Sequence, residues 1–480
     1  KKKNNILEDV RGIVEAFAEL MKKTPDVLEA HKRCVWSINI NRPAKAMIWR
    51  STNAVKADAA RRVFEVKCDE IRWAVIDSGI DATHPAFRLR DKSNKYAASA
   101  FLNEKGEPEN MTRILNTYDF TLIREILSID GTLPKKLRDR LQKTERGREL
   151  RQTLKKRLKK GLAVDWEVLL PFLEIPHVRG EYEVPVFAHG THVAGILAAD
   201  WAAGSPKIIK DDENVNKDVA NINKDEGNLQ KPEENYNEDE NNYKDIDIKG
   251  VCPDLRLYDL RVLNDIGEGD EFSVLAALQF AQYLNSKQLN LHGVNLSFSI
   301  EHKVKNFACG CTPVCEEAER LVNSGLIVVA AAGNNGYIES KMEGGYSEGY
   351  RSISITDPGN AQGVITVGAT HRDSPHMYGV SYFSSRGPTG DGRIKPDLVA
   401  PGEKITSTVP GCGLRSMDGT SMAAPHVSGA AALLIARHRE LIGKPARVKQ
   451  ILCETATDLG RERYFQGRGM IDILRAMQSV

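Results

Sequence analysis

The run IRWAVIDSGI at residues 71–80 decides the fold class, because it begins as a continuous apolar strand and ends in a polar turn. Apolar runs of this length are typical of strands buried on both faces of a parallel sheet. Further strands are expected at 293–299 and 325–332, and helices at 273–285, 314–324 and 421–440. This alternation predicts an α/β fold with a mainly parallel sheet, in which sites form at the carboxyl ends of the strands.

Composition leaves room for a large core and excludes several other classes of protein. The chain has 480 residues, of which 41% are hydrophobic, and a net charge of +2 that favours no particular partner. Its eight cysteines are too few for a disulfide scaffold. The apolar run at 326–332, which no other exceeds in length, is far shorter than the roughly 20 residues of a membrane-spanning helix.

Three side chains have the chemistry that peptide-bond cleavage by a serine requires. A serine hydroxyl attacks only when a base removes its proton; a histidine can do this near neutral pH, and a carboxylate orients and stabilises that histidine. Asp77 ends the first strand, and His189 and Ser421 each stand where a helix is expected to begin.

Each of these residues also has a simpler interpretation. Asp77 could be an ordinary turn residue, and Ser421, in the run GTSMAAPH, could be only a helix cap. His189 and His192, in the run HGTHVAGI, could bind a metal, but no glutamate stands at the usual metalloprotease spacing. We therefore take His189 as the base and His192 as a buried structural residue.

A fourth element is the run VVAAAGNNG at 328–336, where a strand leads to Asn334 in a glycine-flanked turn. An asparagine amide can donate a hydrogen bond to the oxyanion of a tetrahedral intermediate. The alternative is that Asn334 and Asn335 merely fill turn positions.

The four runs together resemble the subtilisin-like serine peptidases, over about residues 71–200 and 248–475. The order Asp, His, Ser along the chain is also the order of the subtilisin triad. The resemblance implies a three-layer fold, in which helices flank the central sheet. It also implies a serine endopeptidase that works through an acyl-enzyme intermediate.

The same resemblance implies a role for each candidate residue. Asp77 would orient His189, which would act as general base and acid, and Ser421 would be the nucleophile. Asn334 and the backbone N–H of Ser421 would form the oxyanion hole. These roles are expectations that depend on the tertiary structure.

Substrate binding follows from the same resemblance. One edge segment would pair with an extended substrate, and another would form the opposite edge and a wall of the primary pocket, so that binding occurs by strand addition. The residues implied are Gly267, Glu268, Gly269, Ser297, Phe298, Ser299 and Gly333. The dipeptide Asp357-Pro358 resembles a cis-proline turn near the pocket floor.

The chain is expected to contain an N-terminal helical extension, 1–70, and a peptidase domain, 71–480. Helical periodicity is clear at 6–22 and predicts a helix that packs on the enzyme, a propeptide or a partner-docking helix. Two insertions interrupt the domain: a basic helical one at about 88–180, and an acidic, disordered one at about 205–247.

Charge is concentrated in these insertions. Residues 135–160 carry 13 Lys/Arg against 3 Asp/Glu, and residues 211–247 carry 13 Asp/Glu against 4 Lys. One hypothesis is that the two segments dock on each other and cover part of the cleft, so that the enzyme is latent until cleavage or a protein partner activates it. The alternative is two solvated insertions without a regulatory role.

No metal or cofactor is expected. The acidic insertion lacks the alternating oxygen ligands of a calcium loop, and Cys309, Cys311 and Cys315 lack a fourth ligand for zinc. We expect a protein or peptide substrate and no nucleic-acid partner. The basic N-terminus lacks a signal-peptide run, which favours a cytoplasmic over a secreted protein, although a chain that starts without Met leaves export open.

Overall fold

The computed structural model describes residues 48–480 except 91–94, 104, 130–131, 134, 136, 139–144, 203–246, 288–290, 304 and 343–344. Contacts group Ala46–Val480 into one compact unit. The predicted helix at 6–22 and nearly all of the predicted acidic insertion lie outside the described residues.

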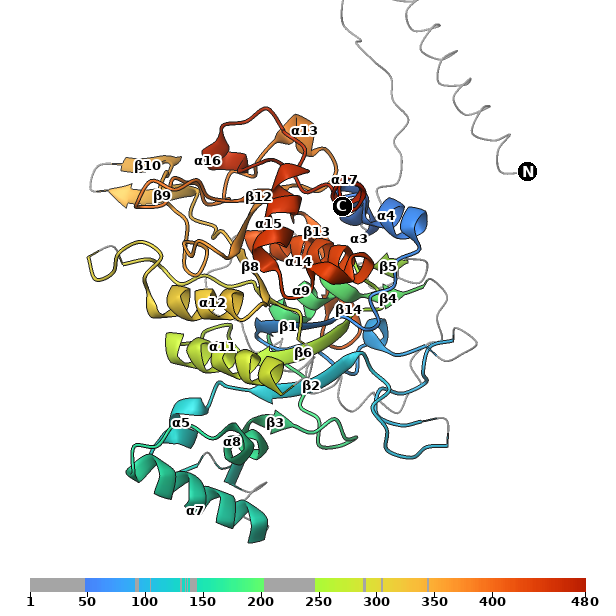
Figure 1. The fold of residues 1–480 in the computed structure, drawn as a ribbon, viewed down its shortest axis with the longest axis vertical. Coiled ribbons are helices and arrows are strands. Elements are labelled where there is room, and N and C mark those ends of the chain that lie inside the picture. The colour runs from blue at the N-terminus through green and yellow to red at the C-terminus, as the bar shows by residue number, and fades with distance from the viewer. Residues whose placement is uncertain are drawn as a thin grey trace, which may run out of the picture. The chain divides into compact units, whose positions relative to one another are not determined.

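An eight-stranded sheet forms the centre of this unit (Figure 1). In spatial order its strands are β12 (Leu398–Glu403), β11 (Ile365–His371), β8 (Ile327–Ala331), β7 (Gly293–Leu296), β1 (Arg72–Asp77), β6 (Arg256–Arg261), β2 (Ile114–Asp119) and β3 (Glu174–Ile175). All neighbouring pairs are parallel except β2 and β3. The predicted α/β fold with a mainly parallel sheet is therefore confirmed.

Helices cover both faces of the sheet and make the three layers (Figure 1). One face carries α11 (Glu271–Ser286) and α12 (Pro313–Asn323), and the other carries α9 (His189–Ala198), α14 (Thr420–Arg437) and α15 (Pro445–Glu454). Strand β1 contributes side chains to the hydrophobic core on each face of the sheet, because alternate side chains of a strand point to opposite faces. Trp73 and Val75 pack with α9 and α14, whereas Ala74 and Ile76 pack with α11 and α12.

Local chemistry sets where the predicted helices begin. The carboxylate of Asp270 accepts a hydrogen bond from the backbone N–H of Ser273 at 2.8 Å and caps α11. Thr312 caps α12, where Pro313 occupies the first helical position without losing a needed N–H. The strands and helices expected from sequence thus correspond to β1, β7, β8, α11, α12 and α14.

The remaining elements complete the body around these layers. They are α3 (Ile48–Ala54), α4 (Ala57–Phe64), η1 (Pro85–Phe87), α5 (Ile123–Leu127), α7 (Glu145–Lys159), α8 (Trp166–Leu173), β4 (Asp200–Trp201), β5 (Ile248–Lys249), β9 (Tyr337–Met342), β10 (Gly345–Tyr350), α13 (Pro375–Tyr378), β13 (Ile405–Val409), β14 (Gly413–Met417), η4 (Arg439–Leu441), α16 (Arg463–Gln466) and α17 (Ile473–Gln478).

Helix α7 is the described part of the predicted basic helices. Leu150, Leu154 and Leu158 join the core on the α11 side of the sheet. Arg151 is buried between them and donates to the carbonyl of Ser128 at 3.2 Å. The apolar stripe of this basic helix therefore anchors it to the body.

The segment before β1 packs on the body as well. In α4, Arg61 donates to the carbonyl of Gly250 at 2.7 Å, and the N–H of Ile473 donates to the carbonyl of Val55 at 3.1 Å. Residues 48–70, which the sequence assigned to an extension, are thus integrated into the same compact unit as the sheet.

Candidate active site

The ends of β1 and the start of α9 bring Asp77 and His189 together. Asp77 Oδ1 accepts a hydrogen bond from His189 Nδ1 at 2.8 Å and another from the N–H of Ser78 at 2.7 Å. The Asp77 side chain is 1% exposed and that of His189 is 20% exposed. With a carboxylate on Nδ1, the proton lies on that nitrogen, which leaves Nε2 as the basic atom.

The electrostatics of this pair favour a protonatable imidazole. Burial lowers the pKa of His189, but the charge of the Asp77 carboxylate and its hydrogen bond outweigh burial. The net effect raises the pKa of His189 above its usual 6.5.

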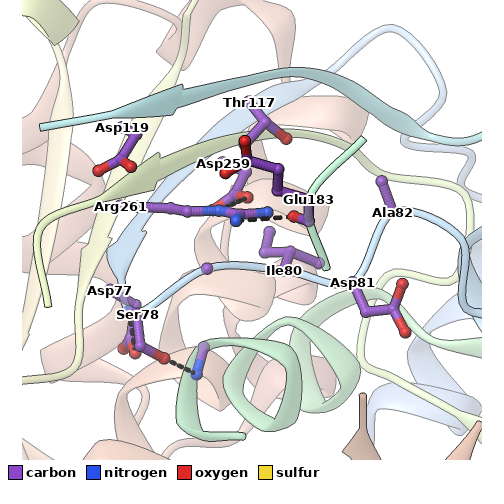
Figure 2. A network of polar contacts seen from close by, with 12 residues as sticks. Asp77, Ser78, Ile80, Asp81, Ala82, Thr117, Asp119, Glu183, Asp259 and Arg261 are labelled. Atoms are coloured by element: carbon purple, nitrogen blue, oxygen red, sulfur yellow. Dashed lines mark hydrogen bonds and ion pairs between the residues drawn. The ribbon is translucent and has the colours of Figure 1, made fainter. Parts of the chain in front are cut away.

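Ser78 holds the start of α9 against the end of β1 (Figure 2). Its hydroxyl accepts from the N–H of Gly190 at 3.0 Å and donates to the carbonyl of Phe187 at 3.2 Å. A Cβ at Gly190 would lie 2.5 Å from the carbonyl oxygen of Gly79, so only glycine permits this approach.

Beneath the same loop lies a buried arginine, Arg261, which is the register partner of Asp77 on β6. Figure 2 shows its guanidinium reaching from the sheet to the segment that precedes α9. Arg261 Nε donates to Asp259 Oδ2 at 3.0 Å, and Nη1 donates to the carbonyl of Glu183 at 2.9 Å. Burial lowers the pKa of Arg261, but the Asp259 carboxylate reverses this and raises it, so the guanidinium stays charged.

Ser421 lies in the first turn of α14, beside the end of β7. Its hydroxyl donates to the carbonyl of Ser297 at 2.7 Å. Within the described part of the chain, no hydrogen bond joins it to His189. Ile76 pairs with Leu296, so Asp77 and Ser297 each follow a paired residue of two adjacent strands. Adjacent strands lie roughly 4.8 Å apart.

Asn334 is exposed at the turn that follows β8, and its amide is oriented by α14. Its Oδ1 accepts from the N–H of Thr420 at 2.9 Å and from the Thr420 hydroxyl at 3.0 Å. Because Oδ1 is occupied in this way, the Nδ2 donor points elsewhere; it lies 3.4 Å from where a Cβ of Gly419 would stand.

The segments expected to bind substrate flank this centre. Gly267 has a φ of +79°, and a Cβ there would lie 2.6 Å from the ring of Phe187, which stacks at 6.3 Å on His189. The main chain of Glu268 is occupied, since its N–H donates to Asn264 Oδ1 at 2.9 Å and its carbonyl accepts from the Asn264 N–H at 2.8 Å. Strand addition at this segment remains a prediction.

On the opposite side, Ser297 is buried, Phe298 is half-buried and Ser299 is exposed. The strand segment ends where Ile300 and Asp357 exchange two backbone hydrogen bonds of 2.9 Å. The peptide bond between Asp357 and Pro358 is cis.

Gly333 has a φ of +102°, and its N–H donates to the Thr420 hydroxyl at 3.1 Å. A Cβ at this position would lie 2.6 Å from Thr356 Oγ1 and 2.9 Å from Ser385 Oγ. The turn that carries Asn334 therefore requires glycine before it.

Other candidates are separate from this centre. His192 is fully buried, and its Nε2 lies 2.9 Å from the carbonyl of Arg415; burial lowers its pKa to about 3. It is therefore a structural residue, as the sequence predicted. Among the described residues, no group of three or more His, Cys, Asp or Glu could hold a metal ion, and Cys309, Cys311 and Cys315 are free thiols.

Four residues near the centre were not singled out from the sequence: Ser78, Tyr182, Arg261 and Thr420. Ser78 and Thr420 adjoin Asp77 and Ser421 in the chain, so their position in the motifs could have indicated them. Tyr182 and Arg261 carried no signal, because only packing brings them to the loop after Asp77.

Comparison with known proteins gives the family. Residues 179–470, more than half of the chain, match the Subtilase family (Peptidase S8). The chain belongs to the subtilase family. The match includes His189, Asn334 and Ser421, and it begins beyond Asp77 in the chain. Asp77, outside the matched range, forms a hydrogen bond with His189 inside it.

Several known subtilases are similar to this one. Subtilisin DY of Bacillus licheniformis is 32% identical over 231 residues, which cover 48% of this chain and 71% of that protein. Subtilisin E of Bacillus subtilis (strain 168) is 33% identical over 233 residues, 48% of this chain and 52% of that protein. Pyrolysin of Pyrococcus furiosus is 30% identical over 269 residues, 48% of this chain and 18% of that protein.

These findings confirm that this subtilase is a subtilisin-like serine peptidase, which acts on protein substrates. The chain spans about half the length of subtilisin E. In the part that the structure describes, no helix combines the length and apolar character needed to cross a membrane.

Proposed function

We propose that this subtilase is an endopeptidase that hydrolyses peptide bonds through an acyl-enzyme on Ser421. The observation that carries the proposal is the 2.8 Å hydrogen bond from His189 Nδ1 to Asp77, made at the strand end adjacent to Ser297 and Ser421. That bond leaves His189 Nε2 free to act as the base that accepts the serine proton.

The chemistry proceeds in two halves. His189 Nε2 accepts the Ser421 proton while Oγ bonds to the carbonyl carbon of the substrate, and it then returns that proton to the leaving amine as the C–N bond breaks. In the second half His189 takes a proton from water as the water oxygen bonds to the ester carbon, and it returns that proton to Ser421 Oγ as the ester C–O bond breaks and the acid leaves. Asp77 stabilises the imidazolium in both halves and keeps its own charge.

One movement completes the arrangement. The Ser421 hydroxyl is held by the Ser297 carbonyl, and rotation about its Cα–Cβ bond would turn Oγ toward His189. Asp77, which contacts His189, and Ser297, which contacts Ser421, stand at the ends of adjacent strands, so we expect no backbone shift to be needed. Catalytic hydrogen bonds in ligand-free structures are often long and tighten only when substrate binds.

Two donors support the charge that develops on the substrate oxygen. Thr420 fixes the carbonyl side of the Asn334 amide, so its N–H₂ group is available to an oxyanion. The N–H of Ser421 lies in the first turn of α14, where helix N–H groups have no acceptor within the helix and the dipole favours negative charge. We assign the oxyanion hole to these two donors.

A fluorophosphonate probe tests the assignment directly, because it bonds only to an activated serine. We expect the wild type to be labelled and Ser421→Ala to be unlabelled. Ser286→Ala, which removes an exposed hydroxyl at the end of α11, serves as the matched control and should label like the wild type. An unlabelled wild type, or labelling that survives Ser421→Ala, would refute the proposed nucleophile.

Latency is the further part of the proposal, and the structure sharpens its test. Removing residues 1–70 would delete α4, whose Ala57 and Ala60 belong to the main core. Removing residues 1–46 spares that packing. If the N-terminal segment restrains activity, the shorter chain labels faster than the full chain; equal labelling rates would argue against restraint by that segment.

A further inference from the structure

A cavity of about 360 Å³ adjoins the start of β12, outside the active site. Its lining comes from residues 394–397, from helix α15 and from residues 463–468. Asp77 stands at the carboxyl end of β1, whereas Asp397 in this lining precedes the amino end of β12, and the strands from β1 to β12 are parallel. The cavity and the active site therefore adjoin opposite edges of the sheet. A volume of this size is typical of small-molecule sites, which span about 300–1,000 Å³.

Helix α15 presents one face to the cavity. Ala446, Lys449, Gln450 and Cys453 recur every three or four residues, the spacing at which side chains of a helix are neighbours. Ala446 and Cys453, together with Ile394, supply an apolar wall. Burial raises the pKa of the Cys453 thiol to about 12, so the thiol stays neutral and adds no negative charge. The cavity can therefore hold an apolar group beside its charged side chains.

Two lysines share one carboxylate at the base of α15. Lys395 Nζ lies 2.7 Å from Asp397 Oδ2, and Lys449 Nζ lies 2.9 Å from Asp397 Oδ1. Both ammonium groups also donate to the carbonyl of Val364, at 2.8 Å and 2.9 Å. The Lys395 side chain is 3% exposed, and burial lowers its pKa to about 7, an effect that Asp397 opposes and Lys449 reinforces. When both lysines are protonated, this buried cluster has one positive charge in excess.

Arg463 and Arg468 add two exposed guanidinium groups to the lining. Within the described ranges, neither side chain makes a hydrogen bond or an ion pair. The carboxylates of the lining are engaged elsewhere, since Asp397 is bonded to the two lysines and Glu454 accepts from Gln450 Nε2 at 2.8 Å. Four cationic side chains therefore surround two carboxylates, which leaves the cavity positively charged.

We propose that this cavity binds a small molecule that carries a phosphate monoester, with the phosphate on Arg463 and Arg468 and the carbon-bearing part on the apolar wall. Guanidinium groups bind phosphate oxygens through paired, charge-assisted hydrogen bonds. A phosphate monoester carries close to two negative charges at neutral pH. It therefore compensates the excess positive charge better than a carboxylate, which carries one. The site does not depend on the proposed peptidase function.

Calorimetric titration of the full chain tests this. The parent protein is Ser421→Ala, because it should not digest itself, and binding to it does not require the peptidase reaction. The probes are phenyl phosphate, inorganic phosphate and benzoate at constant ionic strength, which keeps general charge screening equal. Arg463→Gln and Arg468→Gln each remove one guanidinium from the cavity. Arg475→Gln, which removes an exposed guanidinium on α17 outside the lining, is the matched control.

We expect one molecule of phenyl phosphate to bind per chain, and inorganic phosphate and benzoate to bind more weakly. Each cavity variant should raise Kd for phenyl phosphate about tenfold, in line with the loss of one charge-assisted contact. Arg475→Gln should leave Kd within about twofold of the parent value. Because all three arginines are exposed, the variants should keep the unfolding temperature of the ligand-free parent.

Four results would overturn the inference. The first is no saturable binding of phenyl phosphate to the parent below about 10 mM. The second is a Kd for phenyl phosphate that neither cavity variant changes, and the third is an equal rise of Kd in Arg475→Gln. The fourth is binding of inorganic phosphate or benzoate as tight as that of phenyl phosphate, which would show that the cavity does not recognise a monoester.

Discussion

The hydroxyl of Tyr182 donates a 2.6 Å hydrogen bond to the main-chain carbonyl of Ile80, three residues after Asp77. It also accepts a 3.0 Å hydrogen bond from Arg261 Nη2. Tyr182 itself stands in the segment that leads to His189. One phenol therefore joins the loop after the carboxylate to the loop before the imidazole, which fixes the relative position of the two residues.

Tyr182→Phe should lower kcat while leaving KM nearly unchanged. The substitution leaves the N–H of Ala82 and one N–H of Arg261 without their acceptor, at a cost of about 1–3 kcal/mol for an unsatisfied buried group. We expect kcat to fall roughly tenfold as His189 loses its fixed position. Steady-state kinetics measure this, with Tyr378→Phe as the exposed control. Equal kcat in the wild type and Tyr182→Phe would show that the loops hold their geometry without the phenol.

Activity should rise with pH through a value above 6.5, because the base must be neutral and the pKa of His189 is raised. Asp77→Asn removes the charge that raises it, so the residual activity should titrate at lower pH. The kcat/KM profile from pH 5 to 9 measures both. If the low-pH side of the kcat/KM profile does not shift in Asp77→Asn, the titration on that side belongs to a group other than His189.

The stability that His189 contributes to the fold should fall as pH rises, whereas activity should rise. The pKa of His189 is raised in the folded state relative to the unfolded chain, so protonated His189 stabilises the fold. This contribution is complete below the unfolded value and is lost as pH rises through the folded value. The difference in unfolding free energy between the wild type and His189→Gln should therefore shrink from pH 5.5 to pH 8.5, as measured in urea. A constant difference would mean that the titration does not couple to folding.

Asn334→Ala should lower kcat by roughly 10² to 10³, a magnitude that comes from subtilisin, a relative of this chain. Thr420→Val tests the Thr420 hydroxyl, since it removes the donor to Asn334 Oδ1 and the acceptor of the Gly333 N–H, and it keeps the backbone donor to Asn334. We expect a loss of about tenfold, smaller than for Asn334→Ala. If Thr420→Val leaves kcat intact, the backbone bond alone orients the amide.

Gly190→Ala should destabilise the fold and separate the triad. A Cβ at 190 would lie 2.5 Å from the carbonyl oxygen and 2.8 Å from the nitrogen of Gly79, both backbone atoms that cannot rotate away. We expect a loss of about 1–3 kcal/mol in unfolding free energy, typical of overpacking. Gly349→Ala is the matched control, because no atom lies within 4 Å of its Cβ position. Equal stability of the two variants would contradict the close approach.

The sequence by itself determined the α/β class and the main elements, and it supplied the candidate residues of the site. Periodicity is a local property, so the strand at 71–80 and the helix at 273–285 could be predicted from their own residues. Asp77, His189 and Ser421 could be chosen for the same reason, since each stands at the end of a predicted element with side-chain chemistry suited to peptide cleavage.

Only the tertiary structure decided which of these groups meet. Asp77 and His189 are 112 positions apart, and their 2.8 Å contact depends on Ser78, Tyr182 and Arg261, whose partners no local pattern specifies. The hydrogen bond from Ser421 to Ser297 likewise depends on the packing of α14 beside the end of β7. The sequence shows which chemical groups are present. The distances between these groups depend on packing between elements that come from remote parts of the chain.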